Sequence, residues 1–239
     1  MRSIINAMES RDATRSGKEL AWTFWRVFSL WVVSDIGFYI LLPHVGIEAD
    51  YNISPFVVAL YYLVWVFISY VTFENAYRRL SLDISWRNLS TVPLFSVVGI
   101  FLFASYILPQ LPTIQWTETW RAPDLMIATS WYFLPKSVEI LFQQLLIIAL
   151  VLAFKNDGFS IRTTAIWCAV FFGGAHLLLT FGELPLGYIV RFVIAAMTFG
   201  FMFPYILLKS RGGILYSYAV HWAYYAITVV MAHTISPYV

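Results

Sequence analysis

PKSVEILFQQLLIIALVLAF, residues 135–154, carries charged and amide side chains only in its first half and is wholly apolar from Leu145 onward. About 20 mostly apolar residues are needed for a helix to cross a bilayer, and this stretch has that length. Pro135 is better suited to the first turn of a helix than to its interior, because a proline lacks the N–H that interior positions use. The stretch therefore predicts one membrane-spanning helix that starts close to Pro135.

The composition of the whole chain agrees with a membrane protein. Of its 239 residues, 60% are hydrophobic and 12% are charged, and the mean hydropathy is +0.73. Soluble domains have about 25% charged residues, so this chain has too few ionic groups to cover a water-soluble globule. The net charge is +2, and no run of basic residues indicates nucleic acid as a partner. The first expected partner is the lipid bilayer.

Hydropathy predicts an all-α, polytopic bundle of about seven spans. Residues 1–20 are polar and are expected to form a cytoplasmic segment, with residues 21–239 as a single transmembrane domain. A short additional helix is predicted on the outer side at 125–133, because Pro135 separates it from the long apolar run. The seven predicted spans cover residues 21–42, 55–73, 92–108, 135–154, 163–180, 186–208 and 214–235.

The distribution of basic residues predicts the orientation, since cytoplasmic loops are enriched in Lys and Arg. Four precede the first span, and the others of this group follow the second, fourth and sixth spans. This places the N-terminus in the cytoplasm and the C-terminus outside, and we take the plasma membrane as the default location. The basic residues on the predicted cytoplasmic side are Arg2, Arg11, Arg15, Lys18, Arg78, Arg79, Arg87, Lys155, Arg162, Lys209 and Arg211.

Three ionisable side chains within the spans stand out as candidate functional groups: Glu139, His176 and His221. Titratable groups are costly to place in hydrocarbon, so they usually face a polar cavity. Glu139 and Gln143 are four residues apart and share one helical face, and Lys136 can pair with Glu139 from three residues before. We expect the carboxylate and the two imidazoles to converge in the outer half of the bilayer.

The surroundings of these residues follow a recognisable order. Phe172-Gly173-Gly174-Ala175-His176 has the form F-x-x-x-H, a glycine-led run precedes His221, and Glu139 lies in Val138-Glu139-Ile140-Leu141-Phe142-Gln143-Gln144. Over about residues 130–230 the chain resembles the CPBP family, also called Abi, the CAAX-protease and bacteriocin-processing proteins, which are intramembrane endopeptidases. The family pattern is E-E-x-x-x-R, then F-x-x-x-H, then H-x-x-x-N. Glu139, Phe172, His176 and His221 match it.

Three positions depart from this pattern. Val138 stands where the family has its first glutamate, Gln143 replaces the arginine, and Tyr225 replaces the asparagine. Adjacent helical positions point about 100° apart, so Glu139 takes over the role of position 138 only if its helix rotates.

The resemblance implies a peptidase that acts on a peptide or protein within the membrane. Glu139 and His176 would then polarise the attacking water, and His221 would stabilise the oxyanion, with Phe172, Gln143 and Tyr225 in support. A catalytic zinc ion usually has three protein ligands. A Zn²⁺ ion held by His176, His221 and Glu139 is a further hypothesis.

Other classes of function remain open. The departures favour a non-catalytic pseudoprotease that serves as a binding protein, a chaperone or an accessory subunit for a partner membrane protein. A protein with b-haem between His176 and His221 and a transporter are weaker alternatives. A retinal protein is excluded, because the span 214–235 contains no lysine.

Overall fold

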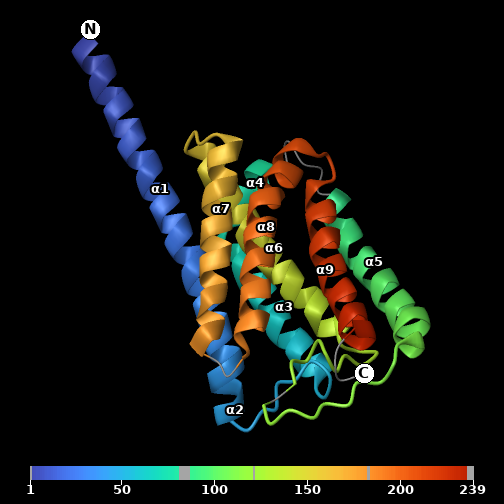
Figure 1. Ribbon diagram of the computed structural model, residues 1–239. Helices are drawn as coiled ribbons and strands as arrows, with labels where there is room; N and C mark the ends of the chain where they lie inside the picture. The colour runs from blue at the N-terminus through green and yellow to red at the C-terminus, as the bar shows by residue number, and fades with distance from the viewer. Residues whose placement is uncertain (1, 81–86, 121, 182–183, 236–239) are drawn as a thin grey trace.

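The computed structural model describes residues 2–80, 87–120, 122–181 and 184–235, and within these ranges the chain forms helices and no strands (Figure 1). The helical elements are α1 (Arg2–Ile36), η1 (Gly37–Leu41), α2 (Leu42–His44), α3 (Pro55–Thr72), α4 (Glu74–Leu80), α5 (Arg87–Leu102), η2 (Phe103–Ile107), η3 (Leu108–Gln110), α6 (Phe133–Asn156), α7 (Ile161–His176), η4 (Leu177–Phe181), α8 (Leu186–Lys209) and α9 (Gly213–Ile235).

The prediction of an all-α bundle with seven spans is confirmed. In the described part of the chain, seven helical segments are long and apolar enough to cross a membrane, and each lies within a few residues of its predicted range. Their bounds are Gly17–His44, Pro55–Thr72, Thr91–Gln110, Phe133–Asn156, Ile161–Thr180, Leu186–Lys209 and Gly213–Ile235.

Helix α6 is the central element of the bundle. It packs against α1, α3, α8 and α9, among others, and residues 144–152 are buried without interruption (Figure 1). Its first turn contains Pro135, as the sequence predicts. Because nearly every face of α6 contacts another helix, its side chains are available to build a site inside the bundle.

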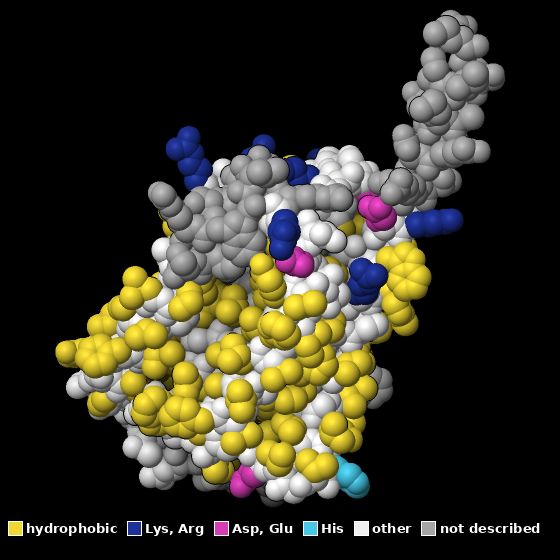
Figure 2. Space-filling view, turned by 180° about the vertical axis from the view of Figure 1, so that it is seen from behind, with side chains coloured by type: hydrophobic (Ala, Val, Ile, Leu, Met, Phe, Trp, Pro, Cys, Tyr) yellow, Lys and Arg dark blue, Asp and Glu magenta, His cyan; other side chains and the backbone are white. Residues whose placement is uncertain are grey.

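The outer surface is that of a protein in lipid. Large apolar side chains are exposed around the helices, for example Phe67 at 67% and Leu186 at 73%. In Figure 2 such side chains cover the middle of the molecule, and Lys and Arg side chains gather at the end from which α1 begins. An apolar belt with charged groups at its ends matches a bilayer with its two interfaces.

Two spans change from α-helix to π-helix immediately before a proline. Leu42 N–H bonds to Gly37 O ahead of Pro43, and Leu108 N–H bonds to Phe103 O ahead of Pro109. A proline ring clashes with the carbonyl four residues earlier, and widening the turn relieves that clash. These local changes come from the prolines and do not interrupt the spans.

The predicted short outer helix at 125–133 is wrong. Residues 124–127 and 130–132 form turns, and the helix begins at Phe133. Asn52, from the loop before α3, explains the difference: its Nδ2 donates to Asp124 O at 2.9 Å, and its Oδ1 accepts from Thr129 N at 2.8 Å. These tertiary bonds engage backbone groups that a helix would need.

Candidate functional site

The two histidines singled out by the sequence share one cavity inside the bundle. Its volume is about 40 Å³, enough for about three water molecules. The polar side chains of its lining are Gln143 of α6, His176 of α7, and His221, Tyr224 and Tyr225 of α9. The remaining wall is aromatic, aliphatic or small: Trp31, Leu146, Ile147, Phe172, Phe192, Ala195, Ala196, Phe199, Gly200 and Phe203. We call this space the paired-histidine cavity.

His176 is the last residue of α7 and is held by its own helix. Its Nδ1 lies 2.8 Å from Phe172 O, four residues earlier, and Trp31 of α1 packs edge-on against the ring at 5.7 Å. A carbonyl oxygen only accepts, so Nδ1 carries a proton. In the neutral ring Nε2 then has a lone pair, which makes it an acceptor or a base.

His221 lies in the middle of α9 and is buried. Gln144 Nε2 lies 3.3 Å from its Nδ1, and the ring stacks on Tyr225 at 5.6 Å. With the Gln144 amide in this orientation its nitrogen donates and Nδ1 accepts, and in the neutral ring Nε2 then carries the proton. His221 Nε2 is therefore a donor, the opposite of His176 Nε2.

Anchors on both sides fix the rotation of α9 that brings His221 to the cavity. Tyr218 Oη donates to Ser137 O at 3.0 Å, and Trp222 Nε1 donates to Ser137 Oγ at 3.1 Å. Both bonds end on one residue near the start of α6. His221, between these two anchors in the sequence, is thereby held in a defined position.

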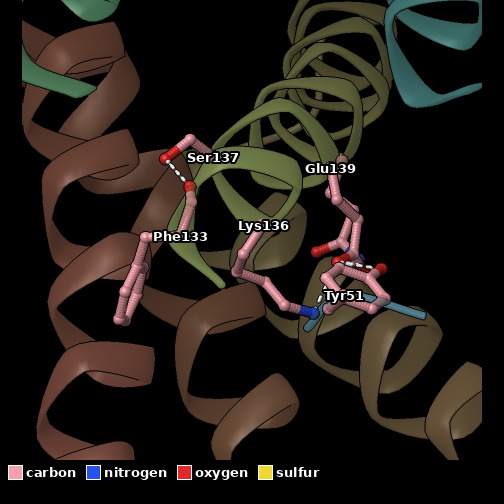
Figure 3. Close-up of polar contacts among 6 residues, drawn as sticks. Tyr51, Phe133, Lys136, Ser137 and Glu139 are labelled. Atoms are coloured by element: carbon pink, nitrogen blue, oxygen red, sulfur yellow. Dashed lines mark hydrogen bonds and ion pairs between the residues drawn. The ribbon is translucent and has the colours of Figure 1, made fainter. Parts of the chain in front are cut away.

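Glu139 is not among the residues that line the cavity. Lys136 Nζ lies 2.5 Å and Tyr51 Oη lies 2.6 Å from Glu139 Oε2, and Gln143 Nε2 lies 3.0 Å from Oε1 (Figure 3 shows Lys136, Tyr51 and Glu139). The predicted pairing of Glu139 with Lys136 is therefore present. Since a carboxylate only accepts, Gln143 turns its NH₂ group toward Glu139. Gln143, which lines the cavity, connects Glu139 to it directly, and Tyr225 does so through Lys136.

Lys136 is enclosed by aromatic rings. Its Nζ lies 4.5 Å from the ring centres of Tyr51 and Tyr225 and 5.9 Å from that of Tyr132. Ammonium groups are attracted to aromatic faces at such distances. Burial, together with the nearby Glu139 charge, raises the pKa of Tyr51 well above its ordinary value, so its phenol remains a donor at neutral pH. We call Lys136, Glu139, Gln143, Tyr51 and Tyr225 the Lys136 network.

The donor set does not match a catalytic metal centre. Among the described residues, no group of three or more His, Cys, Asp or Glu side chains is arranged to hold a metal ion. His176 and His221 share a cavity, but Glu139 bonds to Lys136, Tyr51 and Gln143 outside it. The three residues of the zinc hypothesis do not form a ligand set in this arrangement.

The structure thus brings together five of the six residues chosen from the sequence: Gln143, Phe172, His176, His221 and Tyr225. Sequence reasoning missed Tyr51, Gln144 and Tyr224. Gln144 directly follows Gln143 in the sequence, and Tyr224 directly precedes Tyr225. Only the rotation of each helix in the structure shows that Gln144 contacts His221 and that Tyr224 lines the cavity. No local signal marks Tyr51, which comes from a distant loop. Val138, where the family has glutamate, packs against the hydrophobic core.

The sequence matches no protein-family model, no curated protein and no solved structure.

Proposed function

We propose that this chain is an intramembrane peptidase of the CPBP type, which binds a peptide group of a membrane-embedded substrate at the paired-histidine cavity. One observation carries this proposal: two imidazoles from separate helices line the same small cavity. From their Nδ1 contacts we infer an acceptor at His176 Nε2 and a donor at His221 Nε2. Amide hydrolysis needs both, a base for water and a donor for the oxyanion.

The proposed reaction uses side chains of this chain only. His176 Nε2 takes a proton from water as the water oxygen bonds to the substrate carbonyl carbon, and the carbonyl π electrons move onto its oxygen. His221 Nε2–H donates to that oxyanion. When the C=O bond re-forms, the C–N bond breaks and the leaving nitrogen takes the proton from His176. Glu139 acts as a positioning residue, because it holds the Gln143 amide and Lys136.

The test is turnover of model transmembrane peptides by protein reconstituted in phosphatidylcholine liposomes. We expect His176→Ala and His221→Ala each to lower the cleavage rate at least about 100-fold. The matched control is His44→Ala, because His44 is exposed at the end of α2. Equal rates in wild type and His176→Ala would contradict the role of His176 as base.

A pseudoprotease is the second candidate, and a specific observation favours it. The Glu139 carboxylate is already bonded to Lys136, Tyr51 and Gln143, and Val138 provides no other carboxylate. Such a protein would bind a peptide or partner span without cleaving it. The variant Val138→Glu/Gln143→Arg separates the two candidates: new activity in an otherwise inactive protein indicates a binding protein that retains the rest of a peptidase site.

The remaining alternatives have less support. The haem alternative has no observation in its favour beyond the presence of His176 and His221 at one cavity. The zinc hypothesis is tested by metal analysis of wild type and of His176→Ala/His221→Ala. Stoichiometric zinc in wild type that is lost in the double variant would support a zinc site.

For the orientation, we propose a cytoplasmic N-terminus and an external C-terminus, in the plasma membrane.

A further inference from the structure

One tyrosine that lines the paired-histidine cavity has a buried hydroxyl without a hydrogen-bond partner. Within the described ranges, four buried side-chain atoms have no hydrogen bond: Ser69 Oγ, Gln144 Oε1, Tyr224 Oη and His233 Nε2. Of these residues only Tyr224 lines the cavity. Most buried polar atoms in proteins are hydrogen-bonded, so such an atom beside a cavity needs an explanation.

Tyr224 lies close to His221 on helix α9. It lies three residues further along α9, which places the two side chains on one helical face. Aromatic contacts hold its ring: Phe199 lies edge-on at 5.2 Å, and Phe192 lies edge-on at 6.2 Å. The ring of Tyr224 is thus held at the cavity wall, and among the described residues no protein atom accepts or donates a hydrogen bond at its hydroxyl.

We propose that Tyr224 Oη and His221 Nε2 donate together to the carbonyl oxygen of the bound peptide group. This inference rests on the proposed function and adds a substrate-contacting residue to it. A tetrahedral oxyanion is usually stabilised by more than one donor, and His221 alone supplies one. The family pattern directs attention to position 225, but Tyr225 stacks on His221 and faces Lys136 with its ring.

The test compares Tyr224→Phe with Tyr216→Phe in detergent-purified protein. Tyr216 lies on the same helix and is exposed, so the same hydroxyl is removed away from the cavity. The probe is an acetylated leucine tripeptide aldehyde, whose hydrate has the tetrahedral geometry of the intermediate. The corresponding alcohol serves as the control compound, and thermal unfolding reports binding. Transition-state analogues bind more tightly than ground-state mimics.

We expect the aldehyde to raise the Tm of wild type and of Tyr216→Phe, and the alcohol to leave both unchanged. In Tyr224→Phe the affinity for the aldehyde should fall about 10- to 100-fold. Its Tm without ligand should be equal to or above that of wild type, because an unsatisfied buried hydroxyl is removed.

Two results would overturn the role of Tyr224 and leave the proposed function standing. The first is wild-type affinity for the aldehyde in Tyr224→Phe. The second is a lower Tm of the unliganded variant, which would indicate that the hydroxyl is structural. If wild type itself neither binds the aldehyde nor cleaves the model peptides, the proposed peptidase function fails, and this inference fails with it.

Discussion

At the scale of single residues, Lys136 matters most for the polar contacts around Glu139, because its ammonium group is the counter-charge of that carboxylate. Its side chain is 10% exposed, its partner Glu139 is 12% exposed, and two tyrosine rings flank it at 4.5 Å. Tyr225 and Gln143, which line the cavity, both contact this ion pair. The pair therefore holds cavity residues from two helices in place.

Removing the lysine should be costly because it leaves Glu139 buried without its counter-charge. Breaking one side of a buried pair costs about 3–5 kcal/mol, so we expect Lys136→Met to lower the unfolding free energy by about this amount in a denaturant titration of detergent-solubilised protein. The double variant Lys136→Met/Glu139→Gln should recover most of the loss, because no uncompensated charge remains. A single variant as stable as wild type would mean that the ion pair has no structural role.

At the scale of elements, Gly200 of α8 allows the backbones of α7 and α8 to approach closely. A Cβ atom added at Gly200 would lie 2.6 Å from Cys168 O and 2.7 Å from Ala169 Cα, both backbone atoms of α7. Small residues allow helices in membranes to approach closely. Gly200 also lines the paired-histidine cavity, so this close contact lies at the wall of the cavity.

Gly200→Ala should therefore push these helices apart and destabilise the protein by about 1–3 kcal/mol, the usual cost of overpacking. Gly174→Ala is the matched control on α7, because a Cβ there meets nothing within 4 Å and should be neutral or slightly stabilising. The midpoint of denaturant unfolding measures both variants. Equal midpoints would show that α8 adjusts without loss.

The elements also show what the sequence could and could not predict. The spans were predictable because hydropathy is the same whether an apolar side chain faces lipid or protein. The segment 125–133 was not, because hydrogen bonds from Asn52 determine its conformation. In the site, the positions of His176 and His221 within two separate spans predicted that they meet in one cavity. The sequence could not predict that Glu139 lies outside the cavity lining, or that Tyr224 lines the cavity beside Tyr225. Both depend on the rotation of a helix about its axis, since neighbouring positions point about 100° apart.

At the scale of the whole molecule, the charge distribution makes a prediction about orientation. Lys and Arg side chains gather at the end from which α1 begins (Figure 2), and the rule on positive loops assigns that end to the cytoplasm. His176, at the end of α7, and His221, near the middle of α9, line the cavity. This orientation places the cavity toward the outer half of the bilayer.

Cysteine labelling in intact cells tests this orientation. In a Cys168→Ser background, which removes the one native cysteine, His44→Cys and Lys209→Cys place single thiols at exposed positions at opposite ends. A membrane-impermeant maleimide should label His44→Cys in intact cells and Lys209→Cys only after permeabilisation. The opposite pattern would place the N-terminus outside, and a proposed substrate would then reach the paired-histidine cavity from the cytoplasmic half of the membrane.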